Sequence, residues 1–432
     1  MKKVLFATTA LVATAGYASA DVTLSGVAQM GLQGGDGIAT TQFVQDIDVT
    51  FTMSGTTDNG LTFGASIDLD ENAAGVGADD AGATIFISGD FGTLTMGDTD
   101  GALDWALTEA WVGNAGSIND DETAHAGALG SYLDGAYDGQ ILRYDYAIGD
   151  FGIALSVEMD DADLRDHGYA IGFRYGLDLG AGSLDLGLGY QTATYASTAA
   201  GLTIGNGGVD IEPGFGVPGL AGLVGYQVEV DAIGVSAVYE SNGLSVGLSY
   251  TTFDADYADG SGDMDHVGVG VGYTIDAITV SANWGQYDGD FSVGATNYNI
   301  DQTGYGLAAA YDLGGGLSAH LGYGSSEYDG STTQVDADTW SFGLSMSFCS
   351  TRIIGLRKER ALRPLFSFGL ERFGTRPRQG IENIPRARSA AGCFRFNPVP
   401  ERFMLIPWHF PTSLPASTRP RAPPTARPAR WS

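Results

Sequence analysis

The segment from Thr99 to Asp138 concentrates acidic side chains and contains no lysine or arginine to balance them. Its acidic residues include Asp100, Asp104, Glu109, Asp120, Asp121 and Glu122. Carboxylate oxygens are ligands that Ca²⁺ prefers, and carboxylates that line a narrow aqueous passage attract cations and impede anions. For any single residue of the set, an ordinary solvated position is the alternative interpretation. The chemistry therefore depends on the elements that position these side chains.

Two acidic runs are candidates for metal binding. The first is Asp120, Asp121 and Glu122, and the second is the run DDAD at 160–163. Neither run has the spacing of an EF-hand loop. We predict that no cofactor is required and that Ca²⁺ is the one candidate ion, with the first run as its candidate ligands.

The histidines give little support for an enzyme. Before position 349 they are His125, His167, His266 and His320, and none of them has a zinc-binding spacing. No phosphate-binding loop is present either. We predict that the chain is not an enzyme, with a hydrolase site at one rim of a barrel as the alternative.

The composition changes abruptly after Phe348. Residues 21–348 contain three arginines, no lysine and 48 acidic residues, a net charge of −45, whereas residues 349–432 contain 16 basic and four acidic residues, a net charge of +12. Twelve of the fourteen prolines and both cysteines also follow Phe348. This composition favours a disordered tail. Its two interpretations are a basic periplasmic arm and translation continued in the wrong frame.

The first twenty residues have the pattern of a secretory signal. A basic start at Lys2 and Lys3 precedes an apolar run, and Ala18-Ser19-Ala20 ends it. The apolar run is shorter than the roughly 20 residues that span a bilayer as a helix. We therefore predict cleavage after Ala20 and an exported protein.

Residues 21–348 are dominated by alternation with a period of two. In LSVGLSYTT (244–252), large apolar residues alternate with serine, glycine and threonine, so the segment has one apolar and one small polar face. The same pattern predicts sixteen strands, at 22–32, 44–54, 61–70, 82–89, 92–98, 140–149, 151–159, 168–177, 183–194, 226–240, 244–253, 266–275, 278–287, 298–311, 317–328 and 335–348.

The connections add a second pattern. Short turns such as SNG, DA and DLGGG alternate with longer polar segments such as ENAAGVGADDA, DADYADGSGDMD and the 40-residue connection 99–138. The pattern predicts an all-β fold, a 16-stranded antiparallel transmembrane β-barrel with a long third loop. A secreted sandwich or solenoid is the alternative. Lysine is absent from the polar faces, and Tyr and Trp gather near strand ends, where water–lipid boundaries would lie.

Several stretches resemble a known family. The signal segment, the first strand DVTLSGVAQMGLQ, the stretch GDFGTLTMGD and the terminal WSFGLSMSF are similar to general porins of Gram-negative bacteria, especially the Rhodobacter-type porins of alphaproteobacteria. The resemblance covers 1–348. It implies a homotrimer in the outer membrane, in contact with lipid and lipopolysaccharide, through which small hydrophilic solutes diffuse. It also implies that the third long loop folds into the lumen and constricts the pore, and that Ca²⁺ is held near that loop.

The resemblance also implies which residues form the pore site. The constriction candidates on the loop are Asp98, Asp100, Asp104, Glu109, Asp120, Asp121 and Glu122. Alternation turns Arg143, Asp145 and Arg174 from the wall into the lumen, where an arginine facing a loop carboxylate would produce a transverse field. Porins of this type commonly present several basic wall residues, whereas this chain offers two. Asp98 occupies a position that is often basic in relatives. We therefore expect a cation-selective pore.

Two other functions remain in competition. A solute-specific outer-membrane channel is the nearest alternative, and a barrel adhesin is the second. An adhesin would need very long surface loops, and besides the pore loop only 195–225 is a candidate. We expect no nucleic-acid partner.

Overall fold

The computed structural model describes residues 21–35, 40–70, 82–109, 112–118, 125, 132–134, 137, 140–160, 164–196, 227–330 and 333–349. All of them belong to the first of the two units into which the chain divides, Met1–Arg402. The predicted signal segment 1–20 and the tail from 350 lie outside the described residues. No helix within the described ranges combines the length and the apolar character needed to cross a membrane.

The described residues form sixteen β-strands and one short helix. They are β1 (Asp21–Gly34), β2 (Gln42–Thr56), β3 (Thr62–Asp70), β4 (Ala83–Gly89), β5 (Gly92–Gly97), α1 (Ala102–Ala106), β6 (Ile141–Ile148), β7 (Phe151–Glu158), β8 (Gly168–Asp178), β9 (Ser183–Ala196), β10 (Gln227–Ser241), β11 (Leu244–Tyr257), β12 (Gly260–Ile275), β13 (Ile278–Val293), β14 (Thr296–Gly314), β15 (Leu317–Gly330) and β16 (Thr333–Cys349).

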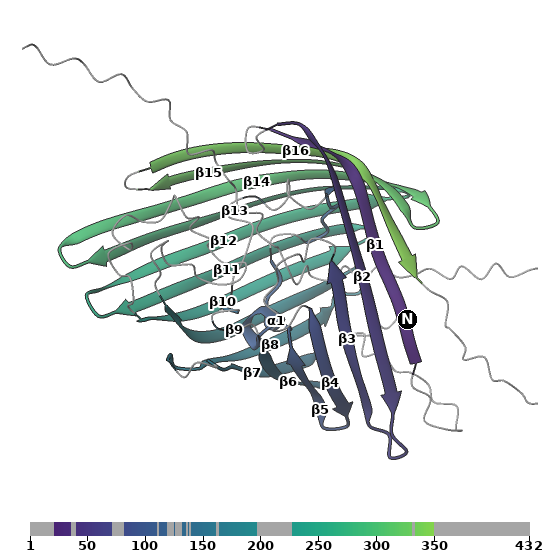
Figure 1. Cartoon of the computed structure of the whole chain (residues 1–432), viewed down its shortest axis with the longest axis horizontal. Helices are drawn as coiled ribbons and strands as arrows, with labels where there is room; N and C mark the ends of the chain where they lie inside the picture. The colour runs from purple at the N-terminus through teal and green to yellow at the C-terminus, as the bar shows by residue number, and fades with distance from the viewer. Residues whose placement is uncertain are drawn as a thin grey trace, which may run out of the picture. The chain divides into compact units, whose positions relative to one another are not determined.

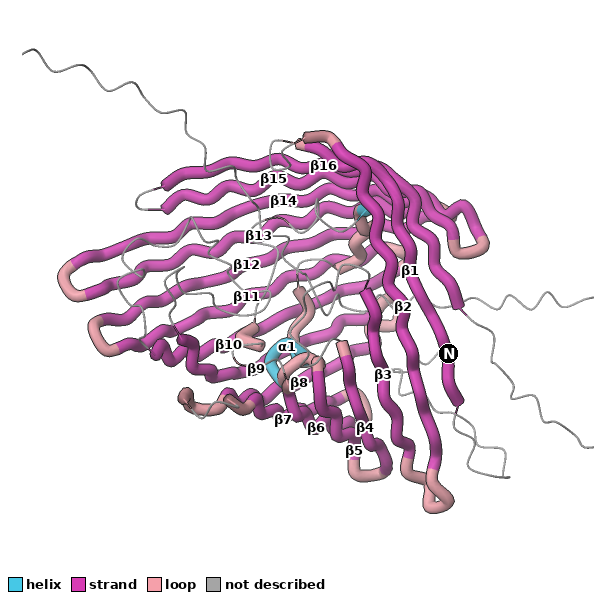
Figure 2. The backbone as a smooth tube through the Cα atoms, viewed as in Figure 1, coloured by secondary structure: helices cyan, strands magenta, loops and turns pink. Residues whose placement is uncertain are grey.

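The strands make one closed antiparallel barrel. Each strand pairs with its neighbours in sequence, and β1 pairs with β16, with Ala28 opposite Met346 (Figures 1 and 2). Closure leaves no sheet edge with unpaired backbone groups, which a hydrocarbon environment would not tolerate. The predicted fold class and strand order are confirmed.

Side-chain alternation separates an apolar outer face from a polar or small inner face. In β12, Val269, Val271 and Tyr273 are 40–43% exposed although they are large and apolar. Their inward neighbours Gly270 and Gly272 are buried. An exposed apolar band around a closed barrel is the face that lipid covers.

The turn between β10 and β11 shows how the sequence sets the register. Asn242 and Gly243 have positive φ angles of 50° and 83°, which a two-residue type I′ hairpin turn requires and an Asn-Gly pair tolerates. The turn places Ser241 opposite Leu244. A Gly-x-Ser-x-Gly spacing, which in hydrolases can carry a nucleophilic serine, occurs at 243–247. Here it lies at the start of a hairpin strand and not at the strand-to-helix turn that a hydrolase nucleophile requires.

The predicted long loop at 254–265 is wrong. β11 runs to Tyr257 and β12 begins at Gly260, so only two residues separate the strands and most of this segment is strand. Alternation continues through it with the polarity reversed, because Asp254 and Asp256 are exposed whereas Ala255 is buried. The high aspartate content of this segment led to the prediction of a loop. A strand can also contain aspartates, provided that its outer face meets water instead of lipid at those positions.

The part of the barrel in which the alternation is reversed, around residues 254–265, carries a row of carboxylates on its outer face. Asp254, Asp263 and Asp290 lie directly opposite one another on β11, β12 and β13. Like charges at such cross-strand positions are destabilising unless water and counter-ions screen them. This end of β11–β13 therefore projects beyond the hydrocarbon layer.

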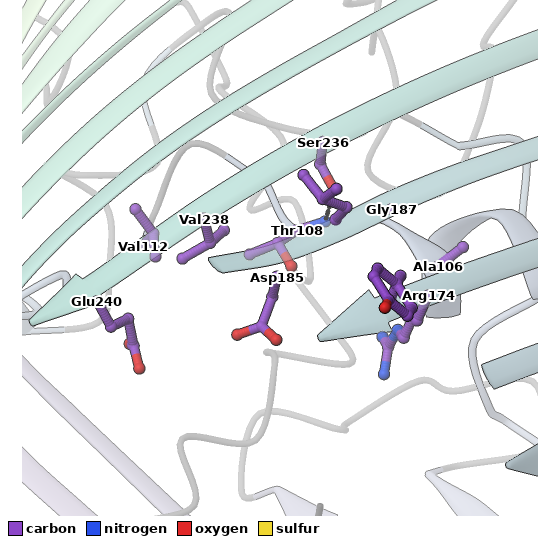
Figure 3. Close-up of a pocket in the computed structure, with 11 residues that line it drawn as sticks. Ala106, Thr108, Val112, Arg174, Asp185, Gly187, Ser236, Val238 and Glu240 are labelled. Carbon is purple, nitrogen blue, oxygen red and sulfur yellow. Dashed lines mark hydrogen bonds between the residues drawn. The ribbon is translucent and has the colours of Figure 1, made fainter. Parts of the chain in front are cut away.

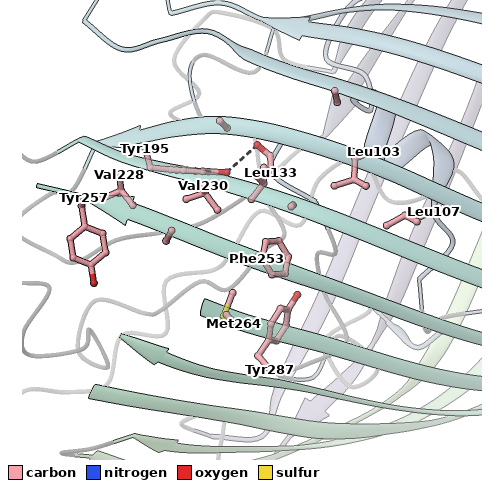
Figure 4. Close-up of a cluster of buried hydrophobic side chains, with 14 of the residues drawn as sticks. Leu103, Leu107, Leu133, Tyr195, Val228, Val230, Phe253, Tyr257, Met264 and Tyr287 are labelled. Atoms are coloured by element: carbon pink, nitrogen blue, oxygen red, sulfur yellow. Dashed lines mark hydrogen bonds between the residues drawn. The ribbon is translucent and has the colours of Figure 1, made fainter. Parts of the chain in front are cut away.

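The inner face of the same region is packed with apolar side chains. Phe253, Met264, Tyr287 and Phe291 are at most 3% exposed and belong to one buried cluster with Val230 (Figure 4). Leucines of the loop between β5 and β6 belong to this cluster too. Part of the barrel interior is therefore a conventional core, which holds the loop.

Candidate functional site

The loop between β5 and β6 lies against the inner wall of the barrel. Its helix α1 contacts β7, β8 and β9. Wall glycines make this contact possible, because a Cβ atom at Gly172 would collide with the carbonyl oxygen of Ala102, and one at Gly187 with that of Ala106. The loop backbone therefore approaches the wall as closely as two main chains can.

Wall serines fix the loop along its course. Their Oγ atoms accept hydrogen bonds from loop N–H groups, Ser156 from Ala102 (2.8 Å), Ser236 from Thr108 (3.0 Å), Ser281 from Ala115 (2.9 Å) and Ser341 from Ile118 (3.3 Å). These serines lie on β7, β10, β13 and β16, so the described part of the loop follows the wall across that whole span. The bonds also satisfy backbone donors that would otherwise be buried without a partner.

A wall histidine adds one more anchor. The Nδ1 atom of His320 lies 2.8 Å from the carbonyl oxygen of Gly116, and its Nε2 atom lies 2.8 Å from Ser318 Oγ. A carbonyl oxygen only accepts, so Nδ1 carries the proton and donates it. His320 is 4% exposed and holds the loop to β15.

Asp134 joins the two ends of the loop. Its Oδ2 atom accepts the Gly101 N–H at 2.6 Å, and its Oδ1 atom accepts the Gln191 side-chain amide at 2.7 Å. Burial raises the pKa of Asp134 to about 6, although these two hydrogen bonds favour the charged form. The loop therefore carries a carboxyl group that titrates near neutral pH.

Asp100 and Arg143 bring the loop and the wall into electrostatic contact. The Nη1 atom of Arg143 donates to the backbone carbonyl of Asp100 at 2.6 Å and lies 3.7 Å from the Asp100 Oδ2 atom. Its Nε atom lies 3.7 Å from Asp145 Oδ1. The structure thus brings together three of the predicted site residues, one from the loop and two from β6.

Arg174 is held by an aromatic ring. Its guanidinium carbon lies 4.4 Å from the centre of the Trp105 ring on α1, a cation–π contact. The ion pairs among the described residues are made by Arg143 and Arg165. The Arg174 charge is therefore oriented by Trp105, and no described carboxylate lies within ion-pair distance of it.

Asp104 lies on α1 among several charged groups. Burial raises its pKa well above the usual range, and the nearby charges of Asp100, Asp134 and Glu109 raise it further, while Arg174 acts in the opposite direction. Asp104 and Glu109 are thus part of the same electrostatic cluster as the wall arginine. This cluster contains no lysine.

The remaining predicted site residues are divided between the loop start and undescribed positions. Asp98 lies at the start of the loop, where its Oδ2 atom accepts the Gly82 N–H at 3.1 Å. Asp120, Asp121 and Glu122 lie outside the described residues. Among the residues that are described, no group of three or more His, Cys, Asp or Glu side chains is arranged to hold a metal ion. The calcium site stays a prediction.

In the second acidic run, Asp160 is described and has a structural role. Its Oδ1 atom pairs with Arg165 Nη2 at 2.8 Å, and its Oδ2 atom accepts the N–H groups of Leu164 and Arg165. The Arg165 hydrogen bond, followed by the Leu164 N–H, lowers the pKa of Asp160 to about 2. Arg165 also lies 4.6 Å from the centre of the Tyr137 ring, so this pair ties the loop after β7 to the end of the pore loop.

A cavity of about 300 Å³ opens between the loop and the wall strands β8, β9 and β10 (Figure 3). Thr108 and Val112 line it from the loop. Arg174, Asp185 and Glu240 line it from the wall. Two of these charged residues, Asp185 and Glu240, were not among the predicted site residues.

The wall residues against which the loop packs were also not predicted from the sequence. Alternation already places Gly172, Gly187 and Ser236 on the inner face, since their neighbours are the large apolar residues of the outer face. A set of inward glycines and serines on consecutive strands was the sequence feature that indicated a wall surface able to hold a loop. What the sequence alone does not show is which loop residue rests on each of them.

A closed antiparallel barrel with an apolar outer band and a loop folded onto its inner wall defines the class of outer-membrane porins. The chain belongs to the Gram-negative porin family, whose sequence profile matches residues 7–331. The family and the fold place the protein in the outer membrane of the Gram-negative cell.

Individual relatives agree with this assignment. A porin of Rhodobacter capsulatus is 33% identical over 192 residues, a match that covers 41% of this chain and 58% of the relative, little more than half its length. A porin structure refined at 1.8 Å resolution is 25% identical, with a TM-score of 0.55 over 76% of this chain and 100% of that one.

Two more distant structures share the fold alone. OmpT of Vibrio cholerae in a trimer form is 13% identical, with a TM-score of 0.55, and an anion-selective porin from Comamonas acidovorans is 13% identical, with a TM-score of 0.51. Each alignment covers 76% of this chain and 100% of the other.

Proposed function

We propose that the protein is a water-filled channel for the passive diffusion of small hydrophilic solutes and ions, with a preference for cations. The observation that supports this most directly is the charge balance between loop and wall. Asp100 and Glu109 stand on the loop and Asp185 and Glu240 on the wall, whereas Arg143 and Arg174 are the two basic residues of the described wall strands. A negative potential in a confined aqueous passage enriches cations and depletes anions.

Selectivity should be measured in planar bilayers under a KCl gradient. We expect stepwise current increases as channels insert, and a reversal potential with the sign of K⁺ permeation. The anion-selective porin from Comamonas acidovorans is a suitable calibrant, because it shares the fold and its name states the opposite preference. A reversal potential on the chloride side would contradict the cation preference, and absence of current steps would contradict the channel.

We also propose that the channel works as a homotrimer in contact with outer-membrane lipid and lipopolysaccharide. A structural neighbour is described as a trimer form, and the apolar outer face offers surface for lipid and for a second barrel. The mass of the detergent-solubilised complex, measured by light scattering with detergent subtraction, should correspond to three chains. A monomer mass under mild detergent would count against it.

The cation preference should weaken as the pH falls from 7 to 5. The pKa of Asp134 is raised to about 6, so this carboxyl group gains a proton in that interval, whereas an ordinary aspartate remains charged until about pH 4. Reversal potentials at closely spaced pH values should show a step near pH 6. An Asp134→Asn variant should lose the step. Asp160→Asn should keep it, because the pKa of Asp160 is lowered to about 2 and this group does not titrate there.

A solute-specific channel is the second candidate. The cavity lined by Arg174, Asp185 and Glu240 favours it, because a fixed arrangement of opposite charges discriminates between solutes that a plain pore would pass equally.

A further inference from the structure

We propose that the cavity between the pore loop and strands β8–β10 is a binding site for a basic amino acid on its way through the channel. The carboxylate of the solute would bind Arg174, its α-ammonium group Asp185, and its side-chain cation Glu240. This inference rests on the proposed channel function, because it assigns a solute class to the same lumen.

The three charged residues form a diagonal row across neighbouring strands. Arg174 on β8 lies opposite Gly187 on β9, and Asp185 lies two residues before Gly187 on β9. Asp185 in turn lies opposite Val238 on β10, and Glu240 lies two residues beyond Val238. Diagonal neighbours of this kind have Cα atoms about 7–8 Å apart. Figure 3 shows the side chains of the row in the order Arg174, Asp185, Glu240.

Arg174 is prepared to receive a carboxylate. The Trp105 ring covers one face of its guanidinium group at 4.4 Å, which fixes its plane and leaves its N–H edge for a ligand. A planar guanidinium group binds a carboxylate through two parallel hydrogen bonds. No described acidic side chain lies within ion-pair distance of Arg174, so a solute carboxylate does not have to displace a partner.

Asp185 and Glu240 provide the complementary charges. Both line the same cavity as Arg174, which groups the three charges into one unit. Ser245 Oγ donates to Glu240 Oε1 at 3.3 Å, which leaves the second carboxylate oxygen for a ligand. One guanidinium and two carboxylate groups give the unit a net charge of −1, and a basic amino acid carries +1.

The lining between the charges suits an aliphatic stem. Val112 from the loop and Val238 from the wall lie between Asp185 and Glu240 in Figure 3. They would contact the methylene groups that separate the two cationic ends of lysine or arginine. The volume of about 300 Å³ lies at the lower limit for small-molecule pockets, enough for one such solute.

The test compares three probes in two assays. L-lysine carries all three charged groups, L-norleucine lacks the side-chain cation, and 1,5-diaminopentane lacks the carboxylate. Each is titrated into the detergent-solubilised protein by calorimetry, and each is added to channels in a bilayer to measure saturable reduction of the current. We expect L-lysine to bind roughly threefold or more tightly than either of the others in both assays.

Single substitutions assign each contact. Glu240→Gln should make L-lysine equivalent to L-norleucine, Arg174→Gln should make it equivalent to 1,5-diaminopentane, and Asp185→Asn should weaken L-lysine and L-norleucine alike. The matched control is Glu229→Gln, which removes the same charge from an exposed position on the outer face of β10 and should leave all three affinities unchanged.

The outcomes separate this inference from the channel itself. Current steps in the bilayer together with equal affinity for the three probes would overturn the binding site and leave the channel standing. Calorimetric binding with the expected ranking but no current steps would support the site and overturn the channel. A ranking that survives Glu240→Gln or Arg174→Gln would overturn the assignment of that contact.

Discussion

Replacing Gly172 by valine should lower the single-channel conductance of the protein. The change adds a Cβ atom where the carbonyl oxygen of Ala102 already touches the wall, and the Ala106 side chain leaves no room beside it. Valine suits a β-strand, so the barrel should persist while α1 moves away from the wall and into the lumen. Overpacking of this kind typically costs about 1–3 kcal/mol, which the loop can avoid only by that displacement.

A matched control distinguishes loop displacement from a general effect of added bulk. Ser66→Val adds bulk to an inward position on β3, a strand outside the group that α1 contacts, and should leave the conductance close to that of the wild type. The measurement is the conductance histogram at fixed salt, with heat-modifiability on gels as the check that both barrels are folded. Equal conductance for Gly172→Val and the wild type would mean that α1 does not border the ion path.

The strand order and the inward or outward orientation of the side chains were predictable because the two-residue alternation is visible within each strand alone. The apolar residues of LSVGLSYTT had to face one way, and hydrogen bonding in lipid required the barrel to close. Arg143 and Asp145 could be turned inward by the same rule. The extension of β11 to Tyr257 could not be predicted, because the outer face changes there from lipid to water and the alternation changes sign.

The contacts of the site were less predictable for a different reason. Trp105 and Arg174 are 69 positions apart in the chain, and nothing in either neighbourhood fixes the point at which the loop crosses β8. That point is set by Gly172 and Gly187, which are small enough to admit α1. Ser156 and Ser236, which accept hydrogen bonds from loop N–H groups, fix it further. Composition identified an acidic loop. Only the position of the loop on the inner wall shows which of its carboxylates contact the wall.

Opposite shifts in ion selectivity are expected from Asp100→Asn and Arg143→Gln. Asp100→Asn removes a negative charge but keeps the backbone carbonyl that receives the Arg143 hydrogen bond, so the loop stays attached. Arg143→Gln removes the facing positive charge. A unit charge about 7 Å from a permeating ion changes its energy by about 0.6 kcal/mol in water. That energy changes the local concentration of each ion about threefold, in opposite directions for K⁺ and Cl⁻.

The permeability ratio of K⁺ to Cl⁻ should therefore fall about sevenfold in Asp100→Asn and rise by a similar factor in Arg143→Gln. Reversal potentials should be recorded at about 0.1 M salt or below, where the screening length is about 10 Å and these charges still act on the permeating ions. The double variant has the same net charge in the pore as the wild type, so its ratio should return toward the wild-type value. Shifts of the same sign in both single variants would mean that the substitutions act by moving the loop. In that case the facing charges of Asp100 and Arg143 would not be what sets the selectivity.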